Sequence, residues 1–228
     1  KNRGMKLLPS EVKVTALAHD IPVYQPVNFR DEATVAELAA LKPDLITVVA
    51  YGRILPVSVL EIPPLGCINI HASLLPRLRG AGPIQWSILN GDEKTGVTAM
   101  YMAAGMDTGD MIAAVETPIT DLDTGVTLTE RLAELGAGLL SDTVRGAAAG
   151  TLTRTPQCEP DATYAPMLSR ELSPIDWAKD FRAISCQVRG LIPWPVATAE
   201  LGGTRFKIFG GEPAENPDGK APGTLIAL

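Results

Sequence analysis

Two side chains near the middle of the sequence, Asn69 and His71, have a spacing that suits shared chemistry. They end the mostly apolar run 65–71, which predicts a strand that finishes at His71. Residues two apart on a strand point to the same side of the sheet, and ligands of open α/β sheets bind beyond the carboxyl ends of the strands. An amide and an imidazole at that place can stabilise a carbonyl oxygen that becomes an oxyanion.

A third candidate group is the carboxylate of Asp107, in the segment 105–110 between two predicted strands. Glycines on both sides of Asp107 allow the backbone to approach a ligand closely. Asp107 could orient His71 or accept a proton from an attacking amine. The alternatives are an ordinary Asp-Thr-Gly turn and a metal site with Asp110, which lacks a third ligand at useful spacing.

A corner of sequence Ser-Leu-Leu-Pro follows His71 at 73–76, and Arg77 and Arg79 come directly after it. The two arginines are either a solvated face or an anion-facing rim beside the site, and the sequence leaves both interpretations open. His19 falls at the end of a predicted helix and is interpreted as structural. A serine or cysteine hydrolase is disfavoured, because no nucleophile elbow surrounds Ser73 and Cys67 lies inside a predicted strand.

The composition is that of a soluble globular enzyme, with 228 residues of which 46% are hydrophobic and 20% are charged. This length allows one large domain or two modest ones. The formal charge of −6 argues against a protein that coats nucleic acid generally. Three widely spaced cysteines offer neither a disulfide framework nor a metal knuckle and indicate reduced thiols in the cytoplasm. No apolar run is long enough for a membrane span.

Alternating elements must position the candidate groups. Helices are predicted at 10–19, 32–41, 57–60, 84–89 and 127–148, and strands at 21–24, 45–50, 65–71, 97–102 and 111–115. The uniformly apolar run 45–50 predicts a strand covered on both faces. The alternation predicts an α/β domain of Rossmann-like, doubly wound type with a mostly parallel sheet.

The composition changes after Gly150. Residues 151–169 are rich in threonine and proline without periodicity, which predicts a linker. A helix at 180–188 and two strands joined by Gly202-Gly203 follow, and they could begin a small β-barrel. The predicted organisation is a first domain at 1–150, a linker at 151–169 and a partial barrel at 170–228. The chain opens without Met and ends in a strand-like run, so we expect a piece of a longer protein.

Asn69, His71 and Asp107, together with the corner 73–76, resemble the active-site signature of the folate-dependent formyltransferase family. The likeness covers 3–228. Three segments are similar to the members that formylate the α-amine of initiator methionyl-tRNA: RGMKL at 3–7 followed by PSEVK at 9–13, AYGRILP at 50–56, and IDW at 175–177 followed by PWP at 193–195. Two positions depart from the family pattern, Ala72, where Gly is common, and Leu78, where an aromatic residue is common.

This resemblance implies that the co-substrate is 10-formyltetrahydrofolate, that no metal takes part, and that the carboxyl-terminal region is an OB-like barrel that helps to bind tRNA. Asn69 and His71 would stabilise the oxyanion, and Asp107 would orient His71 and accept the proton. Arg3 and Lys6 would contact the tRNA. The positions expected to hold the folate are Tyr51, Gly52, Arg53, Ile54, Leu55, Ser73, Leu74, Leu75, Pro76, Gly105 and Met106. We expect a monomer and no membrane partner.

Two alternatives remain open. A formyltransferase that acts on a small amine, such as glycinamide ribonucleotide or an amino sugar, would share the three catalytic residues. The segment 3–7 and the region after the linker argue against it. The second alternative is a binding module and not an enzyme, which would bind folate or tRNA without turnover. It stays open because the resemblance implies that an amino-terminal βαβ segment is missing and that the barrel is truncated.

Overall fold

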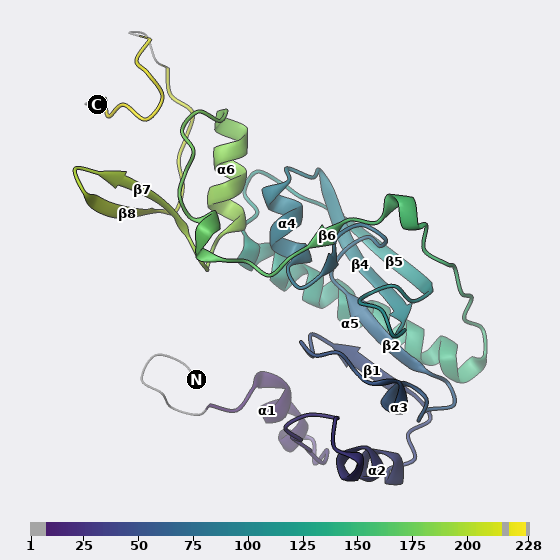
Figure 1. The fold of residues 1–228 in the computed structure, drawn as a ribbon. Helices are drawn as coiled ribbons and strands as arrows, with labels where there is room; N and C mark the ends of the chain where they lie inside the picture. Colours follow the sequence, from purple (N-terminus) through teal and green to yellow (C-terminus); the bar gives the residue numbers. More distant parts are fainter. Residues whose placement is uncertain (1–7, 216–218, 227–228) are drawn as a thin grey trace. The chain divides into compact units, whose positions relative to one another are not determined.

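The computed structural model describes residues 8–215 and 219–226, and the chain divides into two compact units, Lys1–Leu41 and Lys42–Leu228 (Figure 1). The first unit contains two helices, α1 (Glu11–Ala18) and α2 (Glu32–Ala40). The side chains of Ser10 and Asp31 cap them by accepting backbone N–H groups, as such residues do at helix starts. The predicted strand at 21–24 is wrong. Pro22 lacks the donor that a ladder needs, and no described strand pairs with this segment.

A four-stranded sheet in the order β1-β2-β4-β5 is the centre of the second unit. Its strands are β1 (Ile46–Val49), β2 (Cys67–His71), β4 (Lys94–Tyr101) and β5 (Met111–Pro118). Only β1 and β2 are parallel, whereas β4 runs antiparallel to both β2 and β5. The prediction of a mostly parallel sheet is therefore wrong, and the sheet is mixed. The connection from β4 to β5 is too short for the helical crossover that parallel strands require.

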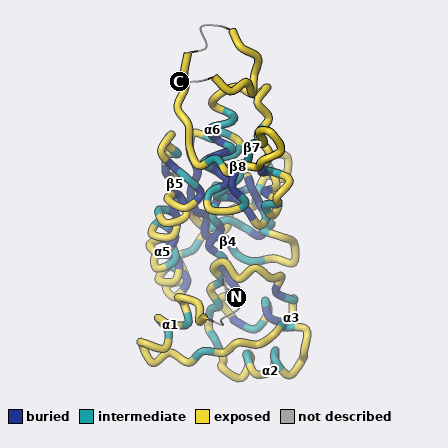
Figure 2. Tube along the Cα trace, turned by 90° about the vertical axis from the view of Figure 1, so that its left-hand side faces the viewer, coloured by how far each residue is buried: buried dark blue, intermediate teal, exposed yellow. Residues whose placement is uncertain are grey.

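The main core lies between this sheet and the long helix α5 (Gly125–Ala149). A capping box formed by Thr124 and Thr127 begins α5, and Gly150 ends it at a φ of 68°, a left-handed conformation that suits glycine. The buried side chains of the core come from α5, from the facing sheet surface and from helix α4 (Pro83–Leu89), and are Ile70, Ile88, Val97, Ala99, Leu128, Leu132 and Leu139. Figure 2 shows buried positions along β4, whereas α1 and α2 contain none.

Strand β1 is less buried than its sequence predicts. Its residues alternate between half-buried and exposed, and Val49 is 57% exposed. The prediction of a strand covered on both faces is wrong for the described residues. The half-buried residues, Ile46 and Val48, share one face of β1, so its apolar composition reflects one packed face and not two.

The segment 151–169 lies along the sheet unit, where β6 (Tyr164–Ala165) pairs in parallel with β3 (Arg79–Gly80). After it come η2 (Arg170–Leu172), α6 (Phe181–Gly190) and a hairpin of β7 (Ala197–Leu201) and β8 (Thr204–Ile208). Gly202 and Gly203, at φ values of 56° and 77°, form the predicted turn. Among the described residues this region contains two paired strands and no closed barrel.

Candidate active site

His71 ends β2 and is only 6% exposed. Its Nε2 lies 2.9 Å from the carbonyl oxygen of Leu78. Because a carbonyl can only accept a hydrogen bond, Nε2 carries the hydrogen and donates it. The other ring nitrogen, Nδ1, faces Asp107 at 3.6 Å from Oδ2. Nδ1 therefore carries a proton only when the imidazole is protonated on both nitrogens, and it is the atom that can exchange a proton at this site.

Asn69 stands two residues before His71 on β2, where its backbone pairs with Val48 on one side and Met100 on the other. Its side chain is half-buried, and within residues 8–215 and 219–226 its amide has no hydrogen-bond partner. Polar groups in such places usually have partners. The Asn69 amide is therefore a donor that remains available to a ligand oxygen, on the same side of the strand as His71.

The segment that carries Asp107 is a tight turn that aims its carboxylate at the site. Asp107 adopts a left-handed conformation with φ of 53°, and its Oδ2 accepts the backbone N–H of Gly80 at 2.9 Å. A Cβ atom at Gly109 would collide with the carbonyl oxygen of Tyr101, so only glycine fits there. The turn interpretation and the approach of Asp107 to His71 both hold, since the turn is what brings the carboxylate to the imidazole.

The corner 73–76 is fastened to the sheet through Thr98 on β4. The Thr98 hydroxyl donates to the carbonyl oxygen of Ser73 at 2.6 Å and accepts the backbone N–H of Leu75 at 3.2 Å. The fully buried hydroxyl of Ser73 donates to the carbonyl oxygen of Arg77 at 2.6 Å. Ser73 thus shapes the corner with its side chain, and the half-buried side chains of the corner that remain for contact with a ligand are those of Leu74 and Pro76.

The structure separates the two arginines: Arg77 is exposed, as the solvated-face interpretation expects, whereas Arg79 fits neither interpretation. Arg79 is 1% exposed and donates to both carboxylate oxygens of Glu159, at 2.8 and 3.1 Å. The hydrogen bonds to Glu159 raise the pKa of the Arg79 guanidinium above its ordinary value, although burial opposes this, and they lower the pKa of Glu159. Arg79 is neither solvated nor an anion-facing rim, because the pairing of β3 with β6 covers it.

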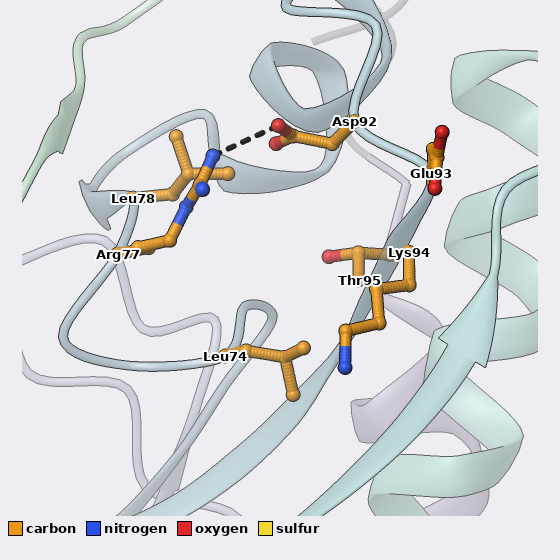
Figure 3. A pocket seen from close by; sticks show the side chains of 7 residues that line it. All are labelled: Leu74, Arg77, Leu78, Asp92, Glu93, Lys94 and Thr95. Carbon is orange, nitrogen blue, oxygen red and sulfur yellow. Dashed lines mark hydrogen bonds and ion pairs between the residues drawn. The ribbon is translucent and has the colours of Figure 1, made fainter.

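Arg77 is 56% exposed and pairs with Asp92 at 2.8 Å beside a small pocket (Figure 3). The pocket has a volume of about 150 Å³ and is lined by Leu74, Arg77, Leu78, Asp92, Glu93, Lys94 and Thr95. Burial raises the pKa of Asp92, and the Arg77 guanidinium opposes that change. The volume is below the roughly 300–1,000 Å³ of typical small-molecule sites, and the pocket contains none of the three candidate catalytic residues.

Residues 1–144 match the family model of the formyl transferase domain, and residues 167–228 match that of the formyl transferase carboxyl-terminal domain. The chain belongs to the formyltransferase family. The expectation drawn from Asn69, His71, Asp107 and the corner 73–76 is thereby confirmed at the level of the family.

One curated relative is the methionyl-tRNA formyltransferase of Pelobacter propionicus, which is 49% identical over 226 residues, covering 99% of this chain and 70% of the relative. Among solved structures, HypX from Aquifex aeolicus in complex with tetrahydrofolic acid has a TM-score of 0.69 at 25% identity, over 87% of this chain and 34% of HypX. A sugar N-formyltransferase from a Shewanella species has a TM-score of 0.71 at 22% identity, over 88% of this chain and 81% of that one. This last likeness shows the fold, a Rossmann-like α/β domain with a mixed sheet.

The other residues predicted to hold folate in this formyltransferase come from two segments. Residues 51–55 connect β1 to the short helix α3 (Val57–Leu60), and there Leu55 is buried while Ile54 is exposed. Met106 is exposed on the turn that precedes Asp107. Exposed apolar side chains of this kind suit a flat aromatic ring. Arg3 and Lys6, the predicted tRNA contacts, lie outside the described residues.

Of the three cysteines, Cys67 and Cys186 are buried and Cys158 is exposed. Cys67 is buried in β2, and burial raises the pKa of its thiol, which keeps it from acting as a nucleophile. The described cysteines form no disulfide. Residues 8–215 and 219–226 contain no group of three side chains that could hold a metal ion. No helix in these ranges has the length and apolar character needed to span a membrane.

Proposed function

We propose that this formyltransferase transfers the formyl group of 10-formyltetrahydrofolate to the α-amine of initiator methionyl-tRNA, the reaction that prepares this tRNA for translation initiation in the cytoplasm. Two observations support the proposal. The chain is 49% identical, over nearly its whole length, to a methionyl-tRNA formyltransferase. The observation that carries the chemistry is the Nδ1 atom of His71 facing the Asp107 carboxylate, on the same side of β2 as Asn69, whose amide has no partner among the described residues.

The chain's own residues can carry each part of this transfer. The Asn69 amide and the protonated Nδ1 of His71 donate to the formyl oxygen while the attacking amine makes it an oxyanion, and losing one such donor typically costs about 10²–10³ in turnover. Asp107 accepts the proton of the amine, directly or through water. As the bond from the formyl carbon to N10 breaks, N10 takes a proton and tetrahydrofolate leaves, so no covalent bond to the protein is needed.

Folate is proposed to lie against residues 51–55, the corner 73–76 and the residues Gly105 and Met106. A relative of known structure, HypX, was solved with tetrahydrofolic acid, which supports folate as the co-substrate. The buried Ser73 serves this site by fixing the corner, since its hydroxyl already donates to the carbonyl oxygen of Arg77.

The carboxyl-terminal region is proposed to be part of an OB-like barrel that binds the tRNA, in a protein that acts as a monomer. The proposed domain organisation is 1–150 for catalysis, 151–169 for the linker and 170–228 for this region. Residues Arg205 and Lys207 lie two apart on β8 and are exposed, as suits contacts with phosphates.

The test is formyl transfer by the full-length protein from 10-formyltetrahydrofolate, with methionyl-tRNA, glycinamide ribonucleotide and an amino sugar nucleotide as competing acceptors. We expect formylation of methionyl-tRNA alone. Formylation of a small amine instead would retain the catalytic residues and overturn the acceptor. Folate binding without transfer to any of the three would favour a binding module.

Replacing Arg3 by Ala is expected to raise the KM for methionyl-tRNA and to leave kcat nearly unchanged. A lost phosphate contact weakens the binding of tRNA whatever its sequence. It also reduces, by about one, the slope of the logarithm of the affinity against the logarithm of the salt concentration. The measurement is the KM at several salt concentrations. Arg205→Ala tests the phosphate contact proposed for the hairpin in the same way. An unchanged KM and salt slope in Arg3→Ala would remove Arg3 from the tRNA contact.

A further inference from the structure

The segment 155–165, called here the arm, lies against both loops that form the catalytic site. At its start, Thr155 and Met111 exchange two backbone hydrogen bonds of 2.9 Å. Near its end, Thr163 accepts from the backbone of two residues of the 77–80 loop, Leu78 at 2.9 Å through its hydroxyl and Arg79 at 2.8 Å through its carbonyl. The arm is therefore fixed at both ends, and Gln157 lies between these ends.

The side-chain amide of Gln157 is directed at the turn that carries Asp107. Its Nε2 donates to the carbonyl oxygens of Asp107 and Gly109, each at 2.8 Å. Its Oε1 accepts from Nε of Arg79 at 3.0 Å. Because a guanidinium can only donate, the amide oxygen must face Arg79, and both amide hydrogens must face the turn.

Arg79 is itself held in one place, since it is buried and bound through two hydrogen bonds to Glu159. The hydrogen bonds thus run from Glu159 through Arg79 and Gln157 to the backbone of Asp107. The residue after Arg79 completes the arrangement, because the N–H of Gly80 donates to the Asp107 carboxylate. Asp107 is consequently held at its backbone by Gln157 and at its side chain by Gly80.

Asp107 needs such support because of its backbone conformation. A left-handed φ of 53° is unfavourable for a residue with a Cβ atom and persists where the surroundings determine it strongly. The two hydrogen bonds from Gln157 bracket this residue, one on its own carbonyl and one on that of Gly109. Without them the turn can relax, and the carboxylate would move away from His71.

We propose that Gln157 is a positioning residue for catalysis, which holds Asp107 against His71 through the backbone of the turn. This inference rests on the proposed formyl transfer, in which Asp107 accepts the proton of the amine. The sequence predicts that the arm is part of a linker. Under this proposal the arm also supports catalysis by the domain that precedes it.

The test is Gln157→Glu in the full-length protein. Glutamate has the same length and keeps the acceptor that Arg79 requires, but it sets an oxygen without a hydrogen against two carbonyl oxygens. A misplacement of about 1 Å in a catalytic group can cost up to roughly 10² in rate. We therefore expect kcat to fall by about 10–10²-fold when both substrates are saturating.

Gln187→Glu is the matched control. The Nε2 of Gln187 also bridges two carbonyl oxygens, those of Leu172 at 2.8 Å and Pro174 at 2.9 Å, and neither carbonyl belongs to the catalytic turn. The same chemical change there is expected to cost similar thermal stability and to leave kcat near that of the wild type. Equal kcat values in the two variants would overturn the proposal.

A double-mutant cycle separates positioning from a general loss of structure. In an Asp107→Ala background, Gln157→Glu is expected to have no further effect on kcat, because the group that it positions is absent. A further loss of the same size in that background would mean that Gln157 acts on something other than Asp107, and would overturn the proposal.

Hydrogen–deuterium exchange of the peptide 102–111 gives a result that does not depend on activity. We expect faster exchange in Gln157→Glu and unchanged exchange in Gln187→Glu. If the wild type formylates none of the acceptors, the proposed function fails while this measurement still decides whether Gln157 holds the turn. Unchanged exchange in Gln157→Glu would overturn the positioning role, whatever the activity of the wild type.

Discussion

The variant His71→Ala is expected to lose about 10²–10³ in kcat, the usual effect of removing one donor to an oxyanion. The imidazole is fixed by its hydrogen bond to the carbonyl of Leu78, so Nδ1 stands in a set position beside Asp107. Asn69→Ala should have a similar effect. The Asn69 amide has no hydrogen-bond partner among the described residues, so it can donate to the ligand oxygen. The measurements are kcat at saturating methionyl-tRNA and the affinity for folate from an equilibrium titration, and only kcat should change greatly.

His19→Ala is the control for this prediction, because His19 is the only other histidine in the sequence. It is exposed at the end of α1 and should be replaceable without loss of kcat. If His71→Ala keeps near-normal kcat, His71 has no part in the transfer. If its kcat is normal but its folate affinity collapses, the residue binds folate and does not stabilise the oxyanion.

The parts of this site that sequence reasoning found are those that depend on local geometry. An alternating strand requires Asn69 and His71 to share one side, and strand β2 ends at His71 as predicted. Glycines around Asp107 predict a turn that allows close approach, and the turn does bring the carboxylate to 3.6 Å from the imidazole. Two helix starts were also predicted, since Ser10 and Asp31 each cap the helix that follows.

The parts that sequence reasoning missed depend on partners far away along the chain. Arg79 donates hydrogen bonds to Gln157 and Glu159, which are 78 and 80 residues away along the chain. No local sequence pattern predicts these contacts. Thr98 was missed because one polar residue in an apolar strand has many explanations, and only the fold shows that it fastens the corner. The direction of β4 was also missed, because a near-continuous apolar run is typical of parallel strands, whereas β4 is buried along most of its length and pairs antiparallel.

Leu78 explains why two arginines that look alike in the sequence behave differently. On a regular strand, Arg77 and Arg79 would share one side of the sheet. Leu78 has a φ of 58°, which interrupts the strand geometry between them. The side chain of Arg77 consequently reaches Asp92 near solvent, whereas that of Arg79 enters the interior beneath the arm.

The variant Arg79→Ala is expected to lower the stability of the protein by about 2–4 kcal/mol, through the loss of a buried, hydrogen-bonded cation and the space it leaves. Its partner Glu159 is 70% exposed and can return to water, which limits the cost. The Oε1 of Gln157, by contrast, loses its only described donor. The midpoint of thermal unfolding should fall by roughly 10 °C, because each kcal/mol shifts it by about 2–4 °C in a protein of this size.

Arg77→Ala tests whether burial is the cause of that loss. Arg77 has the same side chain and a carboxylate partner at the same 2.8 Å, but it is 56% exposed, and exposed pairs contribute about 0–1 kcal/mol. Its unfolding midpoint should therefore fall by no more than roughly 4 °C. Equal shifts in the two variants would contradict the burial of Arg79. A large shift in Arg79→Ala alone would confirm that the buried guanidinium contributes more to stability than the exposed one.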